Sequence, residues 1–278
     1  MQNLKEYIQE KRPSLSAASV KTYDSILRNT YERVFPDDGE FHVEKFNDAE
    51  NFLDHLREVP SAKRKTTLSA LFVISENKAY RAQMMDDIHN YQTEINKQEK
   101  TPSQEENWAD ASQIKQTWEE LKENADLLYK KKNGSAKDIQ DIQKFVILSV
   151  TSGLFIPPRR SLDYCAFKLR GVDHEKDNFL DKRNFVFDSY KTAKTYGTQS
   201  VPIPLALQKI ITKWMTVNES EFLFTDTKGK PLTNVTLSQR LNSIFAGKKI
   251  SVNALRHSYL TTKYGDTIKQ NEELQKKI

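Results

Sequence analysis

The sequence has one cysteine and five scattered histidines among its 278 residues, which limits the chemistry it can support. A single cysteine cannot form a disulfide framework, so a reducing compartment is expected. Cys165 is interpreted as a small buried residue rather than a reactive thiol. The histidines and the cysteine show no metal-ligand spacing, so neither a metal nor another cofactor is predicted.

Long hydrophobic runs are also missing. The longest, such as FVILSV (145–150), is too short to cross a bilayer, and the N-terminal stretch MQNLKEYIQEKRP is charged throughout, unlike a targeting segment. No internal repeat or low-complexity tract is present. With 37% hydrophobic and 29% charged residues, the sequence predicts a soluble globular protein that has no membrane partner, long enough for one large domain or two ordinary ones.

The net charge of +5 is unevenly distributed along the chain. Residues 1–100 contain 15 Lys and Arg against 17 Asp and Glu, whereas residues 101–278 contain 28 against 21. The basic excess therefore lies in the C-terminal part. Such an excess suits a polyanionic partner without requiring one.

Residues 1–95 predict a small all-helical domain. Ser16 is a suitable N-cap for a helix whose apolar residues recur at three-and-four spacing up to residue 34. Further helices are predicted near 47–59, where Asn47 and Glu50 resemble a capping box, after Ser61, and over 79–95. The segment 96–107 has no large apolar residue and contains a proline, so it is predicted to be a linker.

Residues 108–278 predict a second domain of mixed α+β structure. Helices are expected over 111–131, 138–150, 206–215, 234–247 and 251–264. Two short β-rich runs flank a polar turn within 183–204 and predict a hairpin, and 220–232 is expected to form a short strand and turn. The predicted fold class is therefore mainly α with a small β-sheet.

Three basic stretches of the second domain could carry chemistry, and the first is GLFIPPRRSLDY (153–164). Two prolines are expected to break an apolar helix and to present Arg159 and Arg160 at a rigid helix start, with Asp163 beyond them. Arginines held in this way suit bidentate phosphate recognition. The alternative is a surface arginine pair that follows a turn.

The second stretch is YKTAKTYG (190–197), at the tip of the predicted hairpin. Lys191 and Lys194 could reach a phosphate or protonate a leaving oxygen. Hairpin tips are also commonly rich in lysine for solubility alone, so this stretch does not decide between the two interpretations.

The third stretch is NALRHSYLT (253–261). If Ser251 caps the helix, Val252 and Leu255 fall on its apolar face, and a second group of side chains, Asn253, Arg256 and His257, lies beside that face near the helix N-terminus. The N-terminal end of a helix carries partial positive charge and free N–H groups, which favour a phosphate. The group is either a structural cluster or an anion site.

The order of the three stretches is more specific than any one of them. An Arg in R-x-x-D, a Lys on a hairpin and then N-x-x-R-H on a helix resemble the tyrosine recombinase (phage-integrase) family over nearly the whole chain. The stretches look most like versions carried by eukaryotic DNA viruses, virophages and related mobile elements. The resemblance implies that residues 1–95 form a core-binding domain that clamps DNA and that residues 108–278 form the catalytic domain.

The resemblance also implies roles for individual residues. Arg160 resembles the first catalytic arginine and is preferred to Arg159, because Asp163 then takes the acidic position that follows the family arginine. Lys191 resembles the hairpin lysine, with Lys194 as the alternative.

Three further positions come from the helix that begins after Ser251. Arg256 resembles the second catalytic arginine, and His257 beside it is grouped with the catalytic residues. Asn253 occupies the position where the family usually has His or Lys; an amide there can bond a phosphate oxygen but not transfer a proton.

In this family a tyrosine attacks a DNA phosphodiester, which gives a 3′-phosphotyrosyl bond and a free 5′-hydroxyl. The resemblance therefore implies site-specific recombination or integration, without ATP or a metal, by a homo-tetramer assembled on double-stranded DNA. The family's tyrosine would fall just beyond Ile278, so the chain is expected to be truncated before its nucleophile or to receive one from a partner. The expected location is inside a cell at DNA, in a host nucleus or a viral replication compartment.

DNA contacts are also expected outside the catalytic residues. Arg159 and Lys194 are predicted to bind DNA from the second domain. In the first domain the basic cluster Lys63, Arg64 and Lys65, at a helix start, and the weaker candidate Lys21 are predicted to contact phosphates. Such contacts set affinity and salt dependence rather than sequence choice.

Two other functions remain open at this point. One is a non-catalytic DNA-binding protein derived from the recombinase fold, which Asn253 and the absent tyrosine favour. The other is an unrelated helical interaction protein, in which case the chain would not bind duplex DNA even at low salt.

Overall fold

The computed structural model describes residues 3–96, 99–132 and 134–275, and the chain divides into two compact units, Met1–Lys100 (unit 1) and Thr101–Ile278 (unit 2). The division falls inside the segment 96–107 that the sequence predicts as a linker. That segment also contains a short helix, α6 (Pro102–Glu106), because Thr101 and Gln104 form a capping box around its first turn.

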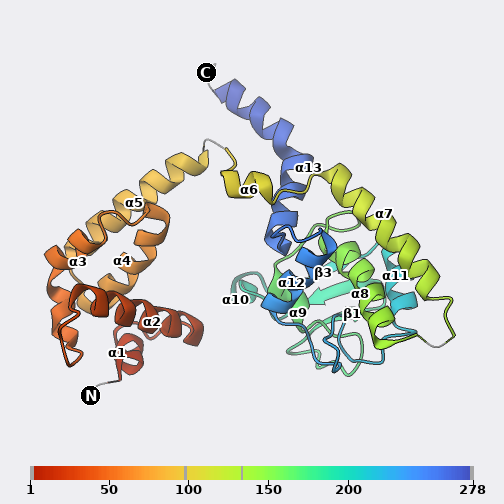
Figure 1. Ribbon diagram of the computed structural model, residues 1–278, viewed down its shortest axis with the longest axis horizontal. Helices are drawn as coiled ribbons and strands as arrows, with labels where there is room; N and C mark the ends of the chain where they lie inside the picture. The colour runs from red at the N-terminus through yellow and green to blue at the C-terminus, as the bar shows by residue number, and fades with distance from the viewer. Residues whose placement is uncertain (1–2, 97–98, 133, 276–278) are drawn as a thin grey trace. The chain divides into compact units, whose positions relative to one another are not determined.

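Unit 1 is all-helical, as the sequence predicts (Figure 1). Its described elements are α1 (Leu4–Lys11), α2 (Ala17–Val34), the 3₁₀ helix η1 (Val43–Asn47), α3 (Ala49–His55), α4 (Ser61–Ser75) and α5 (Lys78–Asn96). Ser16 caps α2 by accepting a hydrogen bond from the backbone N–H of Ser19. The predicted cap at Asn47 is wrong: Asp48 accepts the bond from the backbone N–H of Asn51, and Asn47 ends η1.

One hydrophobic core holds unit 1 together. Its largest fully buried side chains come from five different elements and include Leu4, Leu27, Phe46, Phe52 and Tyr80. The aromatic rings of Phe46 and Phe52 stack with their centroids 5.4 Å apart, and the Tyr80 hydroxyl donates to the carbonyl oxygen of Phe46. Burying a large apolar side chain contributes about 1.5–3 kcal/mol, so these contacts dominate the stability of the unit.

Unit 2 combines helices with a small sheet, which confirms the predicted fold class. After α6 it contains α7 (Ala111–Leu128), α8 (Ala136–Thr151), α9 (Ser161–Cys165), β1 (Asn178–Asp181), β2 (Asn184–Phe187), α10 (Ala193–Tyr196), β3 (Gln199–Pro202), α11 (Leu205–Trp214), α12 (Asn234–Ile244) and α13 (Val252–Gln275). Residues of α8 are buried on every face from Phe145 to Thr151, so α8 is the central helix of this unit.

The sheet is antiparallel with the order β1-β2-β3. Strands β2 and β3 form the predicted hairpin, with Phe187 opposite Gln199 next to the connecting loop. Strand β1 was not predicted. The strand predicted within 220–232 is wrong, because that segment contributes only isolated bridges, Lys168 with Phe222 and Thr225 with Pro231.

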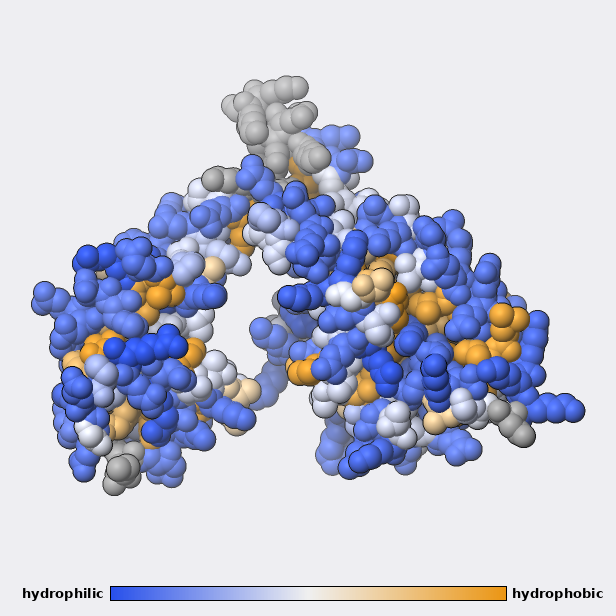
Figure 2. Space-filling model, in the orientation of Figure 1, coloured by the Kyte–Doolittle hydropathy of each residue, from blue (hydrophilic) through white to orange (hydrophobic). Residues whose placement is uncertain are grey.

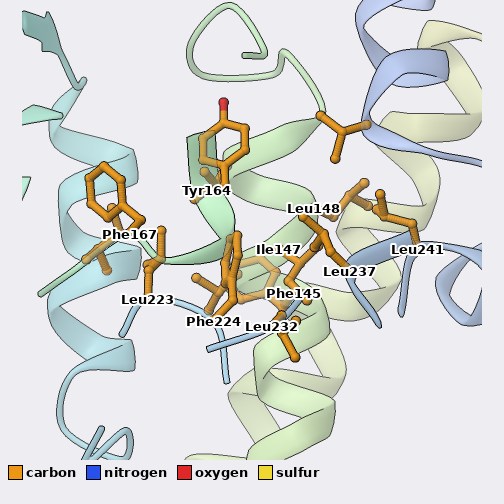
Figure 3. Close-up of a cluster of buried hydrophobic side chains, with 14 of the residues drawn as sticks. Phe145, Ile147, Leu148, Tyr164, Phe167, Leu223, Phe224, Leu232, Leu237 and Leu241 are labelled. Carbon is orange, nitrogen blue, oxygen red and sulfur yellow. The ribbon is translucent and has the colours of Figure 1, made fainter. Parts of the chain in front are cut away.

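The core of unit 2 lies around α8. Figure 3 shows Phe145, Ile147 and Leu148 of α8 among side chains that converge from α9, α12 and the segments around 167 and 223–232. Cys165 is buried and unpaired, and burial raises the pKa of its thiol to about 11, which suppresses the reactive thiolate at neutral pH. The visible face of each unit is mainly hydrophilic with scattered hydrophobic residues (Figure 2).

Candidate functional site

The connection between α8 and α9 carries the first basic stretch. Helix α8 ends at Thr151, ahead of the two prolines, so the prediction that the prolines break this helix is wrong. Instead the chain turns at Gly153, where φ is +89°, and Pro157 and Pro158 keep the following backbone extended. Arg160 is the N-cap residue of α9, as predicted for an arginine at a helix start.

The two arginines of this stretch have different surroundings. The Arg159 side chain is 20% exposed, and its Nε donates to the Asp163 carboxylate at 3.0 Å. Its guanidinium also lies over the rings of Phe187 and Tyr190, at 4.1 and 4.9 Å from the centroids. Arg160 is exposed, and its side chain makes no hydrogen bond or ion pair with any residue the structure describes, so its guanidinium is available to a ligand.

The backbone beside these arginines is fixed from two sides. The N–H of Arg159 donates to the hydroxyl of the fully buried Tyr164 at 2.9 Å. The carbonyl oxygen of Pro158 accepts from Nε of Arg256 at 3.1 Å. The second contact joins the segment that carries Arg160 to the helix that carries Arg256, which brings the two sequence-predicted arginine stretches together.

Helix α13 begins as the sequence predicts. Ser251 Oγ accepts from the backbone N–H of Ala254 at 3.3 Å, and Val252 and Leu255 point into the core. Asn253 and His257 are exposed; Asn253 Oδ1 accepts from Nη1 of Arg256 at 3.1 Å. His257 has no bonding partner among the described residues, so it is open to solvent beside the arginine.

The second basic stretch lies in the β2–β3 connection, residues 188–198. Lys191 and Lys194 are exposed and form no ion pair or hydrogen bond within the described part of the chain. The connection is closed on itself, because the Tyr190 hydroxyl donates to the carbonyl oxygen of Gly197 at 2.7 Å and the Thr198 hydroxyl donates to the Asp188 carboxylate. Tyr190, the neighbour of Lys191, is one of the two aromatic residues that contact Arg159.

A mainly apolar groove of about 470 Å³ lies next to the candidate site, between residues 152–157 and the second and third turns of α13. The Tyr259 ring packs against Gly153, and Nζ of Lys263 donates to the Tyr259 hydroxyl at 3.0 Å, which raises the pKa of Lys263. Tyr259 is therefore a packing residue between the α8–α9 connection and α13.

Replacing Gly153 by Ala is expected to loosen this junction. The added Cβ would lie 2.5 Å from Cδ2 of Tyr259, and the positive φ adds backbone strain of about 1–3 kcal/mol. Gly229→Ala is the matched control, since its φ is +74° and a Cβ there meets nothing within 4 Å. Chemical denaturation should show Gly153→Ala to be the more destabilising by about 1–3 kcal/mol. Equal losses would mean that the contact with Tyr259 does not matter.

The basic cluster of unit 1, like the pair Arg159 and Arg160, contains both exposed side chains and one that is bonded inside the protein. Lys63 and Lys21 are exposed, with no ion pair to a described residue. Lys65 Nζ lies 3.4 Å from the centroid of the Tyr91 ring. Arg64 forms two hydrogen bonds to the buried Asp87, at 2.6 and 2.8 Å, and donates to the carbonyl oxygen of Arg57. The guanidinium of Arg64 is therefore engaged inside unit 1.

Within the described ranges, no group of three or more His, Cys, Asp or Glu residues is placed to hold a metal ion. None of the helices that the structure describes is long and apolar enough to cross a membrane.

The chain matches no family model and no curated protein, but solved structures resemble it. Its fold is the tyrosine recombinase (integrase) fold. A lambda integrase dimer bound to a COC′ core site superposes with a TM-score of 0.50 at 12% identity, over 94% of this chain and 69% of that one. XerA recombinase gives 0.38 at 14% identity over 93% and 81% of the two chains. XerH bound to difH gives 0.42 at 13% identity over 95% and 85%.

Sequence reasoning missed one residue that shapes this site. Asn178 of β1 is 6% exposed and hydrogen bonds both to α9 and to the start of the β2–β3 connection. The only available signal was a polar residue at the head of the short run NFLD, and that signal is too weak to identify a buried amide.

Proposed function

We propose that this chain binds duplex DNA and catalyses phosphoryl transfer at one phosphodiester, as tyrosine recombinases do. The observation that carries the proposal is the hydrogen bond between Arg256 and the carbonyl oxygen of Pro158. This bond joins the helix N-terminus that bears Arg256 and His257 to the segment that bears Arg160. The side chains of Arg160 and His257 have no partner among the described residues, and the fold is that of a DNA-bound integrase.

Each candidate residue has a distinct task in this reaction. The non-bridging oxygens of the phosphate gain charge in the transition state, and the guanidinium groups of Arg160 and Arg256 match their geometry. Lys191, or Lys194 in its place, gives a proton to the departing 5′-oxygen. Asn253 and His257 donate hydrogen bonds to the same phosphate.

The step balances without a cofactor. A tyrosine hydroxyl gives its proton to water as its oxygen attacks phosphorus, and the bond from phosphorus to the 5′-oxygen breaks. The 5′-oxygen takes a proton from the lysine, which regains one from the solvent. The product is a 3′-phosphotyrosyl bond of similar energy, so the attack of a 5′-hydroxyl reverses the step. We do not assign Tyr259 as the nucleophile, because its ring packs on Gly153.

The proposal extends to the biological setting on the resemblance of the motifs alone. The chain works as a homo-tetramer on DNA and carries out integration or recombination for a eukaryotic DNA virus or a related mobile element. It acts in the host nucleus or in a viral replication compartment. In unit 1, Lys63 and Lys21 bind phosphates, and contacts of this kind weaken as salt increases.

A strand-joining assay tests the chemistry without a tyrosine. Duplexes that the chain retains at low salt are selected from a randomised pool and rebuilt with a nick that carries a 3′-p-nitrophenyl phosphate and a 5′-hydroxyl. The 5′-oxygen attacks phosphorus, its proton passes to Lys191, and p-nitrophenolate leaves. We expect coloured product and joined strand in equal amounts from the wild-type chain, and joining slower by about 10²–10⁴-fold from Lys191→Ala.

A second function, non-catalytic DNA binding, is favoured by one contact. Nη1 of Arg256 already donates to Asn253, so part of its hydrogen-bonding capacity is used inside the protein. Salt-sensitive binding of duplex DNA with no joining would support this alternative. Failure to bind any duplex at low salt would exclude both functions and favour a helical interaction protein.

A further inference from the structure

The guanidinium of Arg159 lies between two elements that each carry a candidate catalytic residue. On one side it bonds to Asp163 of α9, the helix that begins after Arg160. On the other side it lies 4.1 Å from the ring centroid of Phe187 and 4.9 Å from that of Tyr190, which precedes Lys191. An arginine can make both kinds of contact at once because its fork bonds a carboxylate while its flat face stacks on rings.

Asn178 joins the same two elements a second time. Its amide nitrogen donates to the carbonyl oxygen of Asp163 at 3.0 Å and to that of Ser189 at 2.8 Å. Its Oδ1 accepts from the backbone N–H groups of Asp188 and Ser189 at 3.0 and 2.8 Å. The two donors and both lone pairs of the amide are therefore used, and among neutral side chains only the longer amide of glutamine offers the same set.

The contacts of Arg159 and Asn178 fix the position of Lys191 rather than that of Arg160. The backbone at Arg160 is held independently, through the Tyr164 hydroxyl and through Arg256. The Lys191 segment is closed by the bond from Tyr190 to Gly197, so it moves as one piece. Among the hydrogen bonds and cation–π contacts of the described residues, those of Arg159 and Asn178 hold that piece against α9.

We propose that Arg159 and Asn178 are positioning residues that hold Lys191 at the distance from the Arg160 phosphate site that proton transfer needs. The inference rests on the proposed function and deepens it, because it assigns Arg159 a task inside the protein and not on DNA. A proton-transfer group must lie within hydrogen-bond reach of its oxygen, and misplacement by about 1 Å can cost about 10²-fold in rate.

The test is the strand-joining assay with Arg159→Lys, which keeps the charge but loses the planar fork. We expect joining at saturating DNA to slow by about 10²-fold, with the affinity for the nicked duplex unchanged. Asn178→Asp, which keeps the acceptor oxygens but removes both donors, should slow joining in the same way. Arg170→Lys is the matched control: this half-buried arginine bonds the carbonyl oxygens of Met215, Asn218 and Ser220, away from the site, so it reports destabilisation alone.

A double-mutant cycle separates positioning from a general loss of structure. If Arg159 acts through Lys191, then Arg159→Lys should have almost no effect once Lys191 is Ala. A variant that only loosens the fold should slow joining by the same factor in both backgrounds, as Arg170→Lys is expected to do.

The outcomes distinguish this inference from the function on which it depends. A wild-type chain that binds DNA and joins no strand overturns the proposed function and this inference with it. If the wild-type chain joins strands while Arg159→Lys matches it, or slows equally with and without Lys191, the inference alone is overturned. Weaker DNA binding by Arg159→Lys at an unchanged joining rate would make Arg159 a DNA contact instead.

Discussion

Replacing Arg256 by Gln is expected to slow strand joining by about 10²–10³-fold, the usual cost of removing one preorganised donor from a developing oxyanion. Arg256 is partly exposed at the N-terminus of α13, and its Nε is fixed by the Pro158 carbonyl oxygen. A donor fixed in this way needs no reorganisation when charge builds on the phosphate. Because the interaction strengthens in the transition state, the loss should appear in the rate and not in the affinity for DNA.

Two further variants separate geometry from charge in this prediction. Arg256→Lys keeps the charge, but a lysine cannot bond the Pro158 carbonyl and a phosphate oxygen with the same fork, so most of the loss should remain. Arg183→Gln removes one positive charge from an exposed position on the turn between β1 and β2 and should leave the joining rate unchanged. If Arg183→Gln slowed joining as much as Arg256→Gln, general attraction of DNA would explain both and the assignment of Arg256 would fail.

The helices of this protein were predictable because their signals are local. Ser16 and the apolar spacing behind it predict α2, and the apolar run of α8 predicts the central helix of unit 2. The hairpin was predictable for the same reason. Strand β1 was missed because four residues, NFLD, show no usable period, and its pairing with β2 is decided by tertiary contacts.

The residue types of the candidate site could also be predicted. Which of these side chains bond inside the protein and which stay open to a ligand could not. The sequence groups Arg159 with Arg160, whereas the structure pairs Arg159 with Asp163 one helical turn later and leaves Arg160 open. The stacking of Arg159 on Phe187 depends on how α9 packs against β2. No spacing rule along the chain contains that information.

The basic cluster Lys63, Arg64 and Lys65 presents the same difficulty in unit 1. Read along the chain, the three charges are equivalent candidates for phosphate contact. The partner of Arg64 is Asp87, which lies 23 residues away on α5 and meets Arg64 only after α4 and α5 have packed. The side chain of Asp87 is 0% exposed and that of Arg64 is 17% exposed, so the pair is part of the core boundary of the unit.

Replacing Arg64 by Ala is therefore expected to destabilise unit 1 by about 3–5 kcal/mol, because it leaves a buried carboxylate without its counter-ion. Lys63→Ala is the matched control from the same helical turn. It should keep the stability within about 0.5 kcal/mol, since Lys63 is exposed and unpaired among the described residues. If Lys63 contacts a phosphate, this variant should also reduce the slope of log affinity against log salt by about 0.9.

The loss of stability in Arg64→Ala can be assigned to one unit by measurements on the full chain. All three tryptophans, Trp108, Trp118 and Trp214, belong to unit 2, so tryptophan fluorescence follows the unfolding of that unit. Circular dichroism at the helical band follows both units. Arg64→Ala should therefore move the circular dichroism transition to lower denaturant and leave the fluorescence transition in place.

The opposite result would change the role of Arg64. If Arg64→Ala kept the stability of unit 1 and weakened DNA binding with a smaller salt slope, its guanidinium would be a phosphate contact and the bond to Asp87 only a resting position. Arg64→Met combined with Asp87→Leu decides between a required charge pair and a required volume. Because buried ion pairs are often replaceable by apolar side chains at little cost, we expect the double variant to recover most of the stability lost in Arg64→Ala.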